Sequence, residues 1–271
     1  MSFAGRRVLS LESRRAPEMA ELIRKQGGEA VVAPSMREVP LADDAGVWRF
    51  AERLFAGEFD MMVLLTGVGV RQLSRALATR YPEDAFADAL RRLTVVARGP
   101  KPVAALREMA VAPDIVAAPP NTWVEVLAAV AGRPARCIAV QEYGRSNPLL
   151  LDGLRVGGAE VTPVRVYQYG LPEDCGPLRQ AVHRLAAGEI DVALFTTAVQ
   201  IEHLVRVARE EGVETAALDG LRRCQVVSIG PTTTEALEEF GLRPAFEPSS
   251  PKLGILVREA AGRAAGAATL K

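Results

Sequence analysis

The sequence repeats itself at a spacing of 131 residues, and this repeat limits the fold more than any other feature. The segment Arg-Leu-Phe-Ala-Gly-Glu-Phe-Asp at 53–60 returns as Arg-Leu-Ala-Ala-Gly-Glu-Ile-Asp at 184–191. At the same spacing Thr66 matches Thr197, and Gly99-Pro100 matches Gly230-Pro231. A spacing kept without a gap over so many positions indicates duplication, so we expect two halves with the same fold.

Each half alternates short aliphatic runs with helical patterns. This alternation is typical of βα units around a parallel sheet, so the predicted fold class is α/β. We expect strands at 7–11, 61–66, 94–99, 137–142, 192–197 and 225–230. Amphipathic helices are expected between them, at 16–26, 47–56, 70–79, 102–109, 178–187, 201–210 and 234–240.

Two extended stretches also correspond to each other, at a spacing of 130. Gly27-Gly28 precedes the stretch 29–41, and Gly157-Gly158 precedes the stretch 160–170. Each contains a proline, Pro34 or Pro163, which suits an edge or a connection better than a central strand. We therefore expect two flavodoxin-like lobes, 1–34 plus 170–271 and 42–160, with 29–41 and 160–170 as linker strands along which the chain crosses and returns. Two consecutive domains with a single linker are the alternative.

Composition excludes several classes of protein. The 271 residues are 49% hydrophobic and 24% charged, with 33 basic and 33 acidic side chains. These values are typical of a globular chain, and a net charge of zero argues against a nucleic-acid or membrane surface as partner. No apolar run is long enough for a membrane helix, and no signal peptide is evident, so we expect a cytoplasmic protein.

The strand-to-helix turns carry the candidate binding residues. A turn of Thr, Gly or Pro at the carboxyl end of a parallel strand leaves free N–H groups where ligands bind. Capping alone would account for any one turn, but four related turns favour a cleft for a ligand with several acidic groups. The candidates are Thr66, Gly67, Val68, Gly99, Lys101, Thr197, Ala198, Gly230, Thr232 and Thr233, with Arg14 and Arg145 as nearby cations.

Strong catalytic groups are missing from the sequence. His183 and His203 are the only histidines, and both fall on helical patterns where a surface position is expected. There is no nucleophile elbow, no metal-ligand cluster and no phosphate loop. A substrate that supplies its own reactivity therefore fits best.

Four segments resemble the uroporphyrinogen-III synthase family. They are Gly5-Arg6-Arg7-Val8-Leu9, Val164-Arg165-Val166-Tyr167-Gln168, the strand at 191–197 and Ile-Gly-Pro-Thr-Thr-Thr-Glu-Ala-Leu at 229–237. The resemblance implies two lobes joined by paired strands, in agreement with the crossover above. Gly99-Pro100-Lys101-Pro102 departs from the family's usual threonine turn, and there a lysine would replace the threonine contact.

The resemblance also implies an activity. The chain would be a cofactor-free lyase of tetrapyrrole biosynthesis that closes hydroxymethylbilane to uroporphyrinogen III, with loss of water and inversion of the last ring. Tyr167 takes the place of the family's linker tyrosine, proposed to help the hydroxyl leave, and Thr233 that of a cleft threonine. We expect a monomer that meets the upstream deaminase only transiently. A non-catalytic two-lobed module for an anionic metabolite is the alternative.

Overall fold

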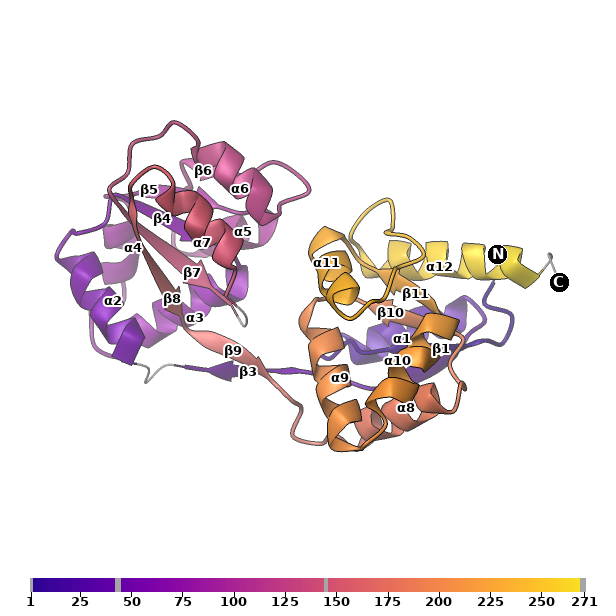
Figure 1. Cartoon of the computed structure of the whole chain (residues 1–271). Helices are drawn as coiled ribbons and strands as arrows, with labels where there is room; N and C mark the ends of the chain where they lie inside the picture. The colour runs from indigo at the N-terminus through magenta and orange to yellow at the C-terminus, as the bar shows by residue number, and fades with distance from the viewer. Residues whose placement is uncertain (1, 42–44, 144–145, 269–271) are drawn as a thin grey trace. The chain divides into compact units, whose positions relative to one another are not determined.

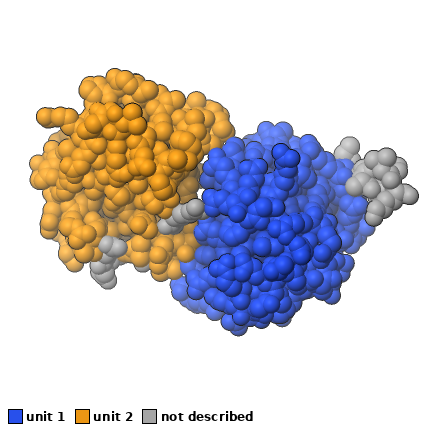
Figure 2. Space-filling view, viewed as in Figure 1, with its two compact units in different colours: residues 1–37, 170–271 blue, residues 38–169 orange. Residues whose placement is uncertain are grey.

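A computed structural model describes residues 2–41, 45–143 and 146–268 (Figure 1). The chain divides into two compact units, which Figure 2 shows in different colours. Unit 1 contains residues 1–37 and 170–271, and unit 2 contains residues 38–169. Unit 1 is thus built from both ends of the chain, and unit 2 from its middle.

Unit 1 is a four-stranded parallel sheet with helices on both faces (Figure 1). The strand order is β11 (Gln225–Ser228), β10 (Val192–Phe195), β1 (Arg7–Ser10) and β2 (Glu29–Val32). One apolar cluster packs helix α8 on one face, through Leu178, Ala181 and Leu185, and another packs helix α12 on the opposite face. The helices are α1 (Ala16–Lys25), α8 (Gly176–Ala186), α9 (Val199–Glu210), α10 (Glu214–Arg223), α11 (Pro231–Glu239) and α12 (Leu253–Ala268).

Unit 2 is a five-stranded parallel sheet, also covered on both faces. Its order is β6 (Ile115–Val116), β5 (Thr94–Ala97), β4 (Met61–Leu64), β7 (Cys137–Glu142) and β8 (Glu160–Arg165). All four residues of β4 are buried, as expected for a central parallel strand covered on both faces. The helices are α2 (Ala45–Phe55), α3 (Gly67–Leu77), α4 (Ala85–Leu90), α5 (Pro100–Glu108), α6 (Trp123–Val130) and α7 (Pro148–Arg155).

The two sheets have the same spatial order once the duplication is taken into account. Strands β2, β1, β10 and β11 of unit 1 correspond to β8, β7, β4 and β5 of unit 2. A parallel bridge from Val227 to Phe246 occupies the place of β6, which pairs with β5 through Val96 and Ile115. The repeat read from the sequence is therefore a repeat of sheet positions, and the predicted α/β class with parallel sheets is confirmed.

A duplicated aspartate holds the amino ends of the central strands together. Asp60 precedes β4, and its Oδ2 accepts hydrogen bonds from the N–H groups of Arg136 and Cys137, at 2.7 and 2.9 Å. Asp191 occupies the same position before β10, and its Oδ2 accepts from Arg7 N–H at 2.7 Å. These bonds lower the pKa of Asp60. The shared aspartate of the repeated octapeptide thus has a structural role.

The extended stretches differ from the expected linkers. The first part of each one is an edge strand, since β2 pairs with β1 and β8 pairs with β7. Pro163 lies within β8, and an edge strand tolerates proline because one side of it needs no ladder donor. Only the later parts connect the units: β3 (Arg37–Pro40) and β9 (Tyr167–Gly170) pair as a separate two-stranded sheet.

Candidate active site

Four helices begin directly after strands at the carboxyl edges of the two sheets. In unit 2, β4 leads to α3 and its neighbour β5 leads to α5 (Figure 1). In unit 1, β10 leads to α9 and its neighbour β11 leads to α11. The N-cap residues are Thr66, Gly99, Ala198 and Gly230. Each unit therefore has two neighbouring helix N-termini on one edge, where anions are favoured by the free N–H groups and the helix dipole.

The turn from β4 to α3 is the one of the four whose N-cap side chain bonds the helix. Thr66 caps α3, and its Oγ1 accepts a hydrogen bond from Gly69 N–H at 3.0 Å. The buried Gln141 side chain accepts from Thr66 N–H at 3.1 Å. Within the described residues no bond engages the N–H groups of Gly67 and Val68, so these two donors are available to an anionic ligand.

Tyr167 lies beneath this turn. Its side chain is fully buried, and its hydroxyl lies 3.1 Å from Thr66 Oγ1. The Tyr169 ring meets it edge to face, with ring centroids 5.5 Å apart. Burial raises the pKa of Tyr167 well above its ordinary value of 10.0, so the phenol remains protonated at any physiological pH. The structure thus brings together two predicted site residues, Thr66 and Tyr167.

A buried glutamine serves the equivalent turn of unit 1, but it comes from a different element. Gln200 lies on α9, and its Oε1 accepts from the N–H groups of Thr196 and Thr197, at 2.7 and 3.3 Å. Thr197 N–H, expected to hold a carboxylate, therefore already has a protein partner. At this turn the N–H groups of Ala198 and Val199 are the unbonded donors within the described part of the chain.

The two glutamine side chains fill equivalent spaces in the two units, but Gln141 reaches its space from a strand and Gln200 from a helix. Gln200 corresponds by the repeat to Gly69, and Gln141 corresponds to Leu11, which follows β1. A Cβ on Gly69 would collide with the Gln141 side-chain amide, so Gly69 leaves the space that Gln141 fills from β7. In unit 1 Gln200 fills the same space from the helix. Both arrangements place a carbonyl oxygen where it accepts the turn's N–H.

The N-terminus of α5 offers fewer donors than expected. Pro100 and Pro102 have no N–H, and Val103 N–H is bonded to Gly99 O at 3.3 Å. Lys101 is exposed at this helix start. Gly67 packs against this turn so closely that a Cβ there would lie 2.5 Å from Lys101 O. The starts of α3 and α5 are therefore adjacent.

The remaining candidates of unit 1 lie around α11 and before α1. Thr232 is exposed, whereas Thr233 is buried and its N–H is bonded to Gly230 O at 3.0 Å. Thr232 N–H is thus the available donor of this turn within the described residues. Arg14 is exposed before α1, and Arg145 lies outside the described residues.

Two buried glutamates were missed by the sequence analysis. Glu12 follows β1, and Glu142 ends β7 at the corresponding position. Glu12 Oε1 accepts from Arg15 N–H at 3.3 Å, and Glu142 Oε1 accepts from Asn147 N–H at 3.2 Å, each at the start of the next helix. Their spacing of 130, equal to that of the paired glycines, was the signal that could have revealed them.

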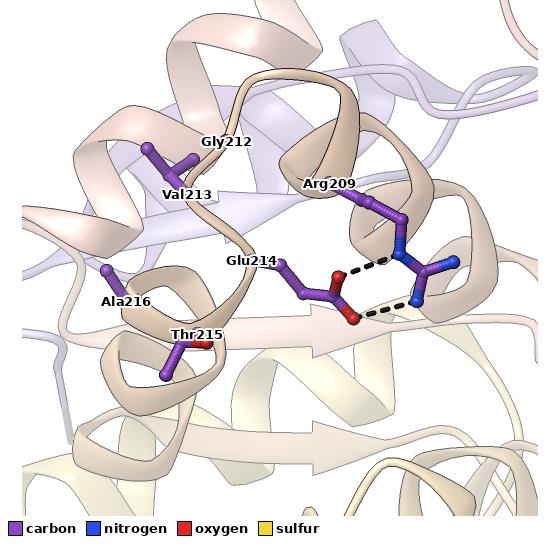
Figure 3. Close-up of a pocket in the computed structure, with 6 residues that line it drawn as sticks. All are labelled: Arg209, Gly212, Val213, Glu214, Thr215 and Ala216. Carbon is purple, nitrogen blue, oxygen red and sulfur yellow. Dashed lines mark hydrogen bonds and ion pairs between the residues drawn. The ribbon is translucent and has the colours of Figure 1, made fainter.

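A shallow pocket of unit 1 lies away from these turns. Figure 3 shows its lining at the connection from α9 to α10, where Glu214 binds Arg209 through two hydrogen bonds of 2.7 and 2.8 Å. Helix α9 begins at the carboxyl edge and has 12 residues, so its far end lies roughly 18 Å away at 1.5 Å per residue. This pocket does not belong to the candidate site.

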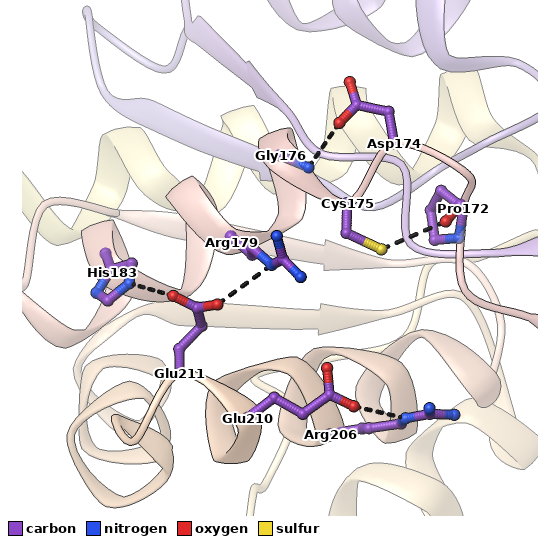
Figure 4. A network of polar contacts seen from close by, with 9 residues as sticks. All are labelled: Pro172, Asp174, Cys175, Gly176, Arg179, His183, Arg206, Glu210 and Glu211. Carbon is purple, nitrogen blue, oxygen red and sulfur yellow. Dashed lines mark hydrogen bonds and ion pairs between the residues drawn. The ribbon is translucent and has the colours of Figure 1, made fainter.

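The two histidines also lie apart from the site. Glu211 forms an ion pair with Arg179 at 3.2 Å and a hydrogen bond with His183 at 3.0 Å, and these exposed contacts tie the end of α9 to α8 (Figure 4). The expected surface position is correct for His183 and wrong for His203, which is buried against Ser35 O at 2.7 Å. Among the described residues no group of three potential ligands could hold a metal ion.

The fold and the site define a class of protein: a duplicated α/β chain with two neighbouring helix N-termini at the carboxyl edge of each parallel sheet. The family model "Uroporphyrinogen-III synthase HemD" matches residues 17–258. The chain belongs to the uroporphyrinogen-III synthase family.

Similar proteins agree with this assignment. A protein from Methanothermobacter thermautotrophicus described as a putative uroporphyrinogen-III synthase is 31% identical, covering 84% of this chain and 87% of its own. The uncharacterized protein YjjA of Bacillus subtilis is 27% identical over 95% of both chains. A crystal structure of a mutant uroporphyrinogen III synthase from Thermus thermophilus is 26% identical, with a TM-score of 0.75, covering 97% of this chain and 100% of that one.

Proposed function

We propose that this chain cyclises hydroxymethylbilane to uroporphyrinogen III, with loss of water and inversion of the last pyrrole ring. The match of residues 17–258 to the synthase family carries the proposal. It is a lyase reaction of tetrapyrrole biosynthesis that uses no cofactor. The non-catalytic binding module considered above is not favoured, because the relatives with an assigned activity are synthases.

The main-chain donors support this function. The linear tetrapyrrole carries eight carboxylates and ionises readily by itself, so the protein chiefly has to fold and position it. We assign substrate carboxylates to the free N–H groups of Gly67 and Val68 at α3, Ala198 at α9 and Thr232 at α11. Donors that are fixed before the substrate arrives require no reorganisation during the reaction, which is the basis of electrostatic catalysis.

We assign assistance of the departing hydroxyl to Tyr167. It is the buried phenol closest to the α3 turn, and its raised pKa keeps its proton in place. Since the side chain is buried in the structure, this role requires a local opening that brings Tyr167 Oη to the substrate. Thr66 would remain its hydrogen-bond partner and fix the direction of the hydroxyl.

Isomer analysis tests the function. The purified protein is incubated with freshly prepared hydroxymethylbilane, the products are oxidised, and the porphyrin isomers are separated. We expect isomer III in excess of isomer I, which forms spontaneously. Isomer I alone, at every protein concentration, would refute the proposal. Thermal stabilisation by uroporphyrin without any isomer III would instead favour the binding module.

A further inference from the structure

We propose that Arg98 and Tyr143 form a binding site for one carboxylate of the acidic substrate on the carboxyl edge of unit 2. Arg98 directly follows β5, and Tyr143 directly follows β7. Strand β4 lies between these two strands, which are separated by two spacings of roughly 4.8 Å. The side-chain contact therefore crosses the carboxyl end of β4, where the chain turns into α3.

The Arg98 guanidinium is held in place by Tyr143. Its Nη1 donates to the Tyr143 hydroxyl at 2.8 Å, and its Cζ lies 5.1 Å from the centre of the Tyr143 ring. The Tyr143 ring itself packs against the apolar clusters on both faces of the sheet. A guanidinium that is oriented before binding loses less rotamer freedom when it meets a carboxylate.

The backbone beneath Arg98 is also fixed. Arg98 N–H donates to Leu64 O at 3.0 Å, which continues the ladder between β5 and β4. With its side-chain amide oriented to satisfy both neighbours, Asn121 donates to Arg98 O at 3.1 Å. The same asparagine fills the space over Gly99, where a Cβ would lie 2.7 Å from its side-chain amide. The arginine thus projects from a rigid turn.

Within the described residues, Arg98 has no acidic partner of the kind that other arginines have. Arg71 on α3 is bound by Glu108 through two hydrogen bonds of 2.7 and 2.6 Å, and Arg15 before α1 is bound by Glu18. Among the residues that the structure describes, no Asp or Glu forms an ion pair with Arg98. Of its five N–H groups, one is used by Tyr143, and the Tyr143 hydroxyl keeps its own proton to donate. The pair therefore presents several donors and a positive charge to a carboxylate.

This inference rests on the proposed function and names a residue that binds its substrate. The test measures KM and kcat for isomer III formation in Arg98→Leu and Tyr143→Phe. We expect Arg98→Leu to raise KM at least about tenfold, as loss of a charge-assisted hydrogen bond should, with kcat changed less than about twofold. Tyr143→Phe should raise KM by a smaller factor, because the ring remains and only the orienting hydroxyl is lost. Arg98→Lys should recover part of the affinity by restoring the charge.

Arg71→Leu is the matched control, because the Arg71 guanidinium is already bound by Glu108. The KM of this variant should remain that of the parent. Thermal unfolding of all variants separates binding from folding: a KM effect at an unchanged Tm supports the site. An Arg98→Leu variant with the parental KM, or one whose kcat and Tm fall together while KM is constant, overturns the inference. A parent protein that makes no isomer III would refute the proposed function. In that case, binding of uroporphyrin to the parent and to Arg98→Leu still tests the site, and equal affinity overturns it.

Discussion

At the scale of single residues, the two predicted side chains that meet in the structure are Thr66 and Tyr167. The sequence suggests Thr66 from its place at a strand end, and the family resemblance implies a role for Tyr167. The structure joins them through a 3.1 Å contact and buries the tyrosine completely. This contact gives Tyr167 two possible roles, one on the substrate directly and one through Thr66.

Replacing Tyr167 by phenylalanine distinguishes these two roles. If the hydroxyl assists the leaving group, Tyr167→Phe should lower kcat for isomer III roughly 100-fold or more, the usual contribution of a positioned acid. Tyr81→Phe, which removes the hydroxyl of a ring packed on Phe55 and keeps the ring, should leave kcat close to that of the parent. Because the pKa of Tyr167 is raised, its ionisation should produce no loss of kcat below about pH 10. A higher KM at constant kcat would assign Tyr167 to positioning Thr66.

His203 leads to a prediction about the pH dependence of stability. Burial lowers its pKa, while the hydrogen bond to Ser35 O and the Glu202 carboxylate oppose this shift. In the unfolded chain the pKa of His203 is near 6.5, so the unfolded chain binds this proton more readily than the folded chain does. The free energy of unfolding should fall as the pH drops through about 6.5.

The variant His203→Asn provides the control. Its side-chain amide N–H can donate to Ser35 O as His203 Nδ1 does, and an amide does not titrate in this pH range. Denaturant unfolding at pH 7.5 and 5.5 should show a larger loss of stability in the parent than in His203→Asn. Equal losses in the two proteins would mean that His203 does not contribute to the acid sensitivity.

At the scale of elements, the duplicated turns keep one function with different residues. Gln141 serves the α3 turn from a strand, and Gln200 serves the α9 turn from a helix. By the repeat, Gly69 of unit 2 stands at the position of Gln200, and Leu11 of unit 1 stands at the position of Gln141. An alignment of the two repeats cannot reveal such an exchange, because it compares one pair of positions at a time. It places each glutamine opposite a residue of another type, a glycine or a leucine.

Transferring the arrangement of unit 1 to unit 2 tests this equivalence. Gly69→Gln alone should overfill the space held by Gln141, and Gln141→Leu alone should leave Thr66 N–H without its acceptor. Each should lower the free energy of unfolding by about 1–3 kcal/mol. The double variant should be more stable than the sum of the two losses predicts. Additive losses, measured by urea unfolding, would show that the two glutamines are not equivalent.

At the scale of the whole molecule, the chain order makes the two units unequal. Unit 2 is continuous and contains all five of its strands. Unit 1 takes β1 and β2 from the N-terminal segment, and β1 lies between β10 and β2 with Val8 and Leu9 fully buried. The C-terminal segment alone therefore lacks half of its sheet.

Fragments of the chain should behave accordingly. We expect the fragment 38–169 to unfold cooperatively on heating, because it keeps both apolar clusters of its sheet. The fragment 170–271 should fail to fold, because β10 would expose an apolar face and an unpaired edge. Circular dichroism during thermal denaturation measures both. A cooperative transition in 170–271 would contradict this account.

The sequence alone was sufficient for the fold class, the duplication and the four strand-to-helix turns, although the pattern begins each of these helices two or three residues too late. Those features depend on local patterns: apolar periodicity, the repeated octapeptide, and Thr, Gly or Pro after each strand. The central strands were placed correctly because each is a buried aliphatic run. The sequence pattern does not separate the edge strands β2 and β8 from the linkers, because a strand with a single neighbour has a weaker pattern and tolerates proline.

Only the tertiary structure decided which donors of the site are free. Thr197 N–H is occupied by Gln200, and the Arg71 guanidinium is bound by Glu108. Arg98 is oriented across β4 by Tyr143, which is 45 positions further along the chain. Hydrogen bonding and burial depend on side chains that the folding of the sheet brings together from distant segments. A local pattern can therefore predict where an anion could bind, while the packed sheet determines which groups remain available to bind it.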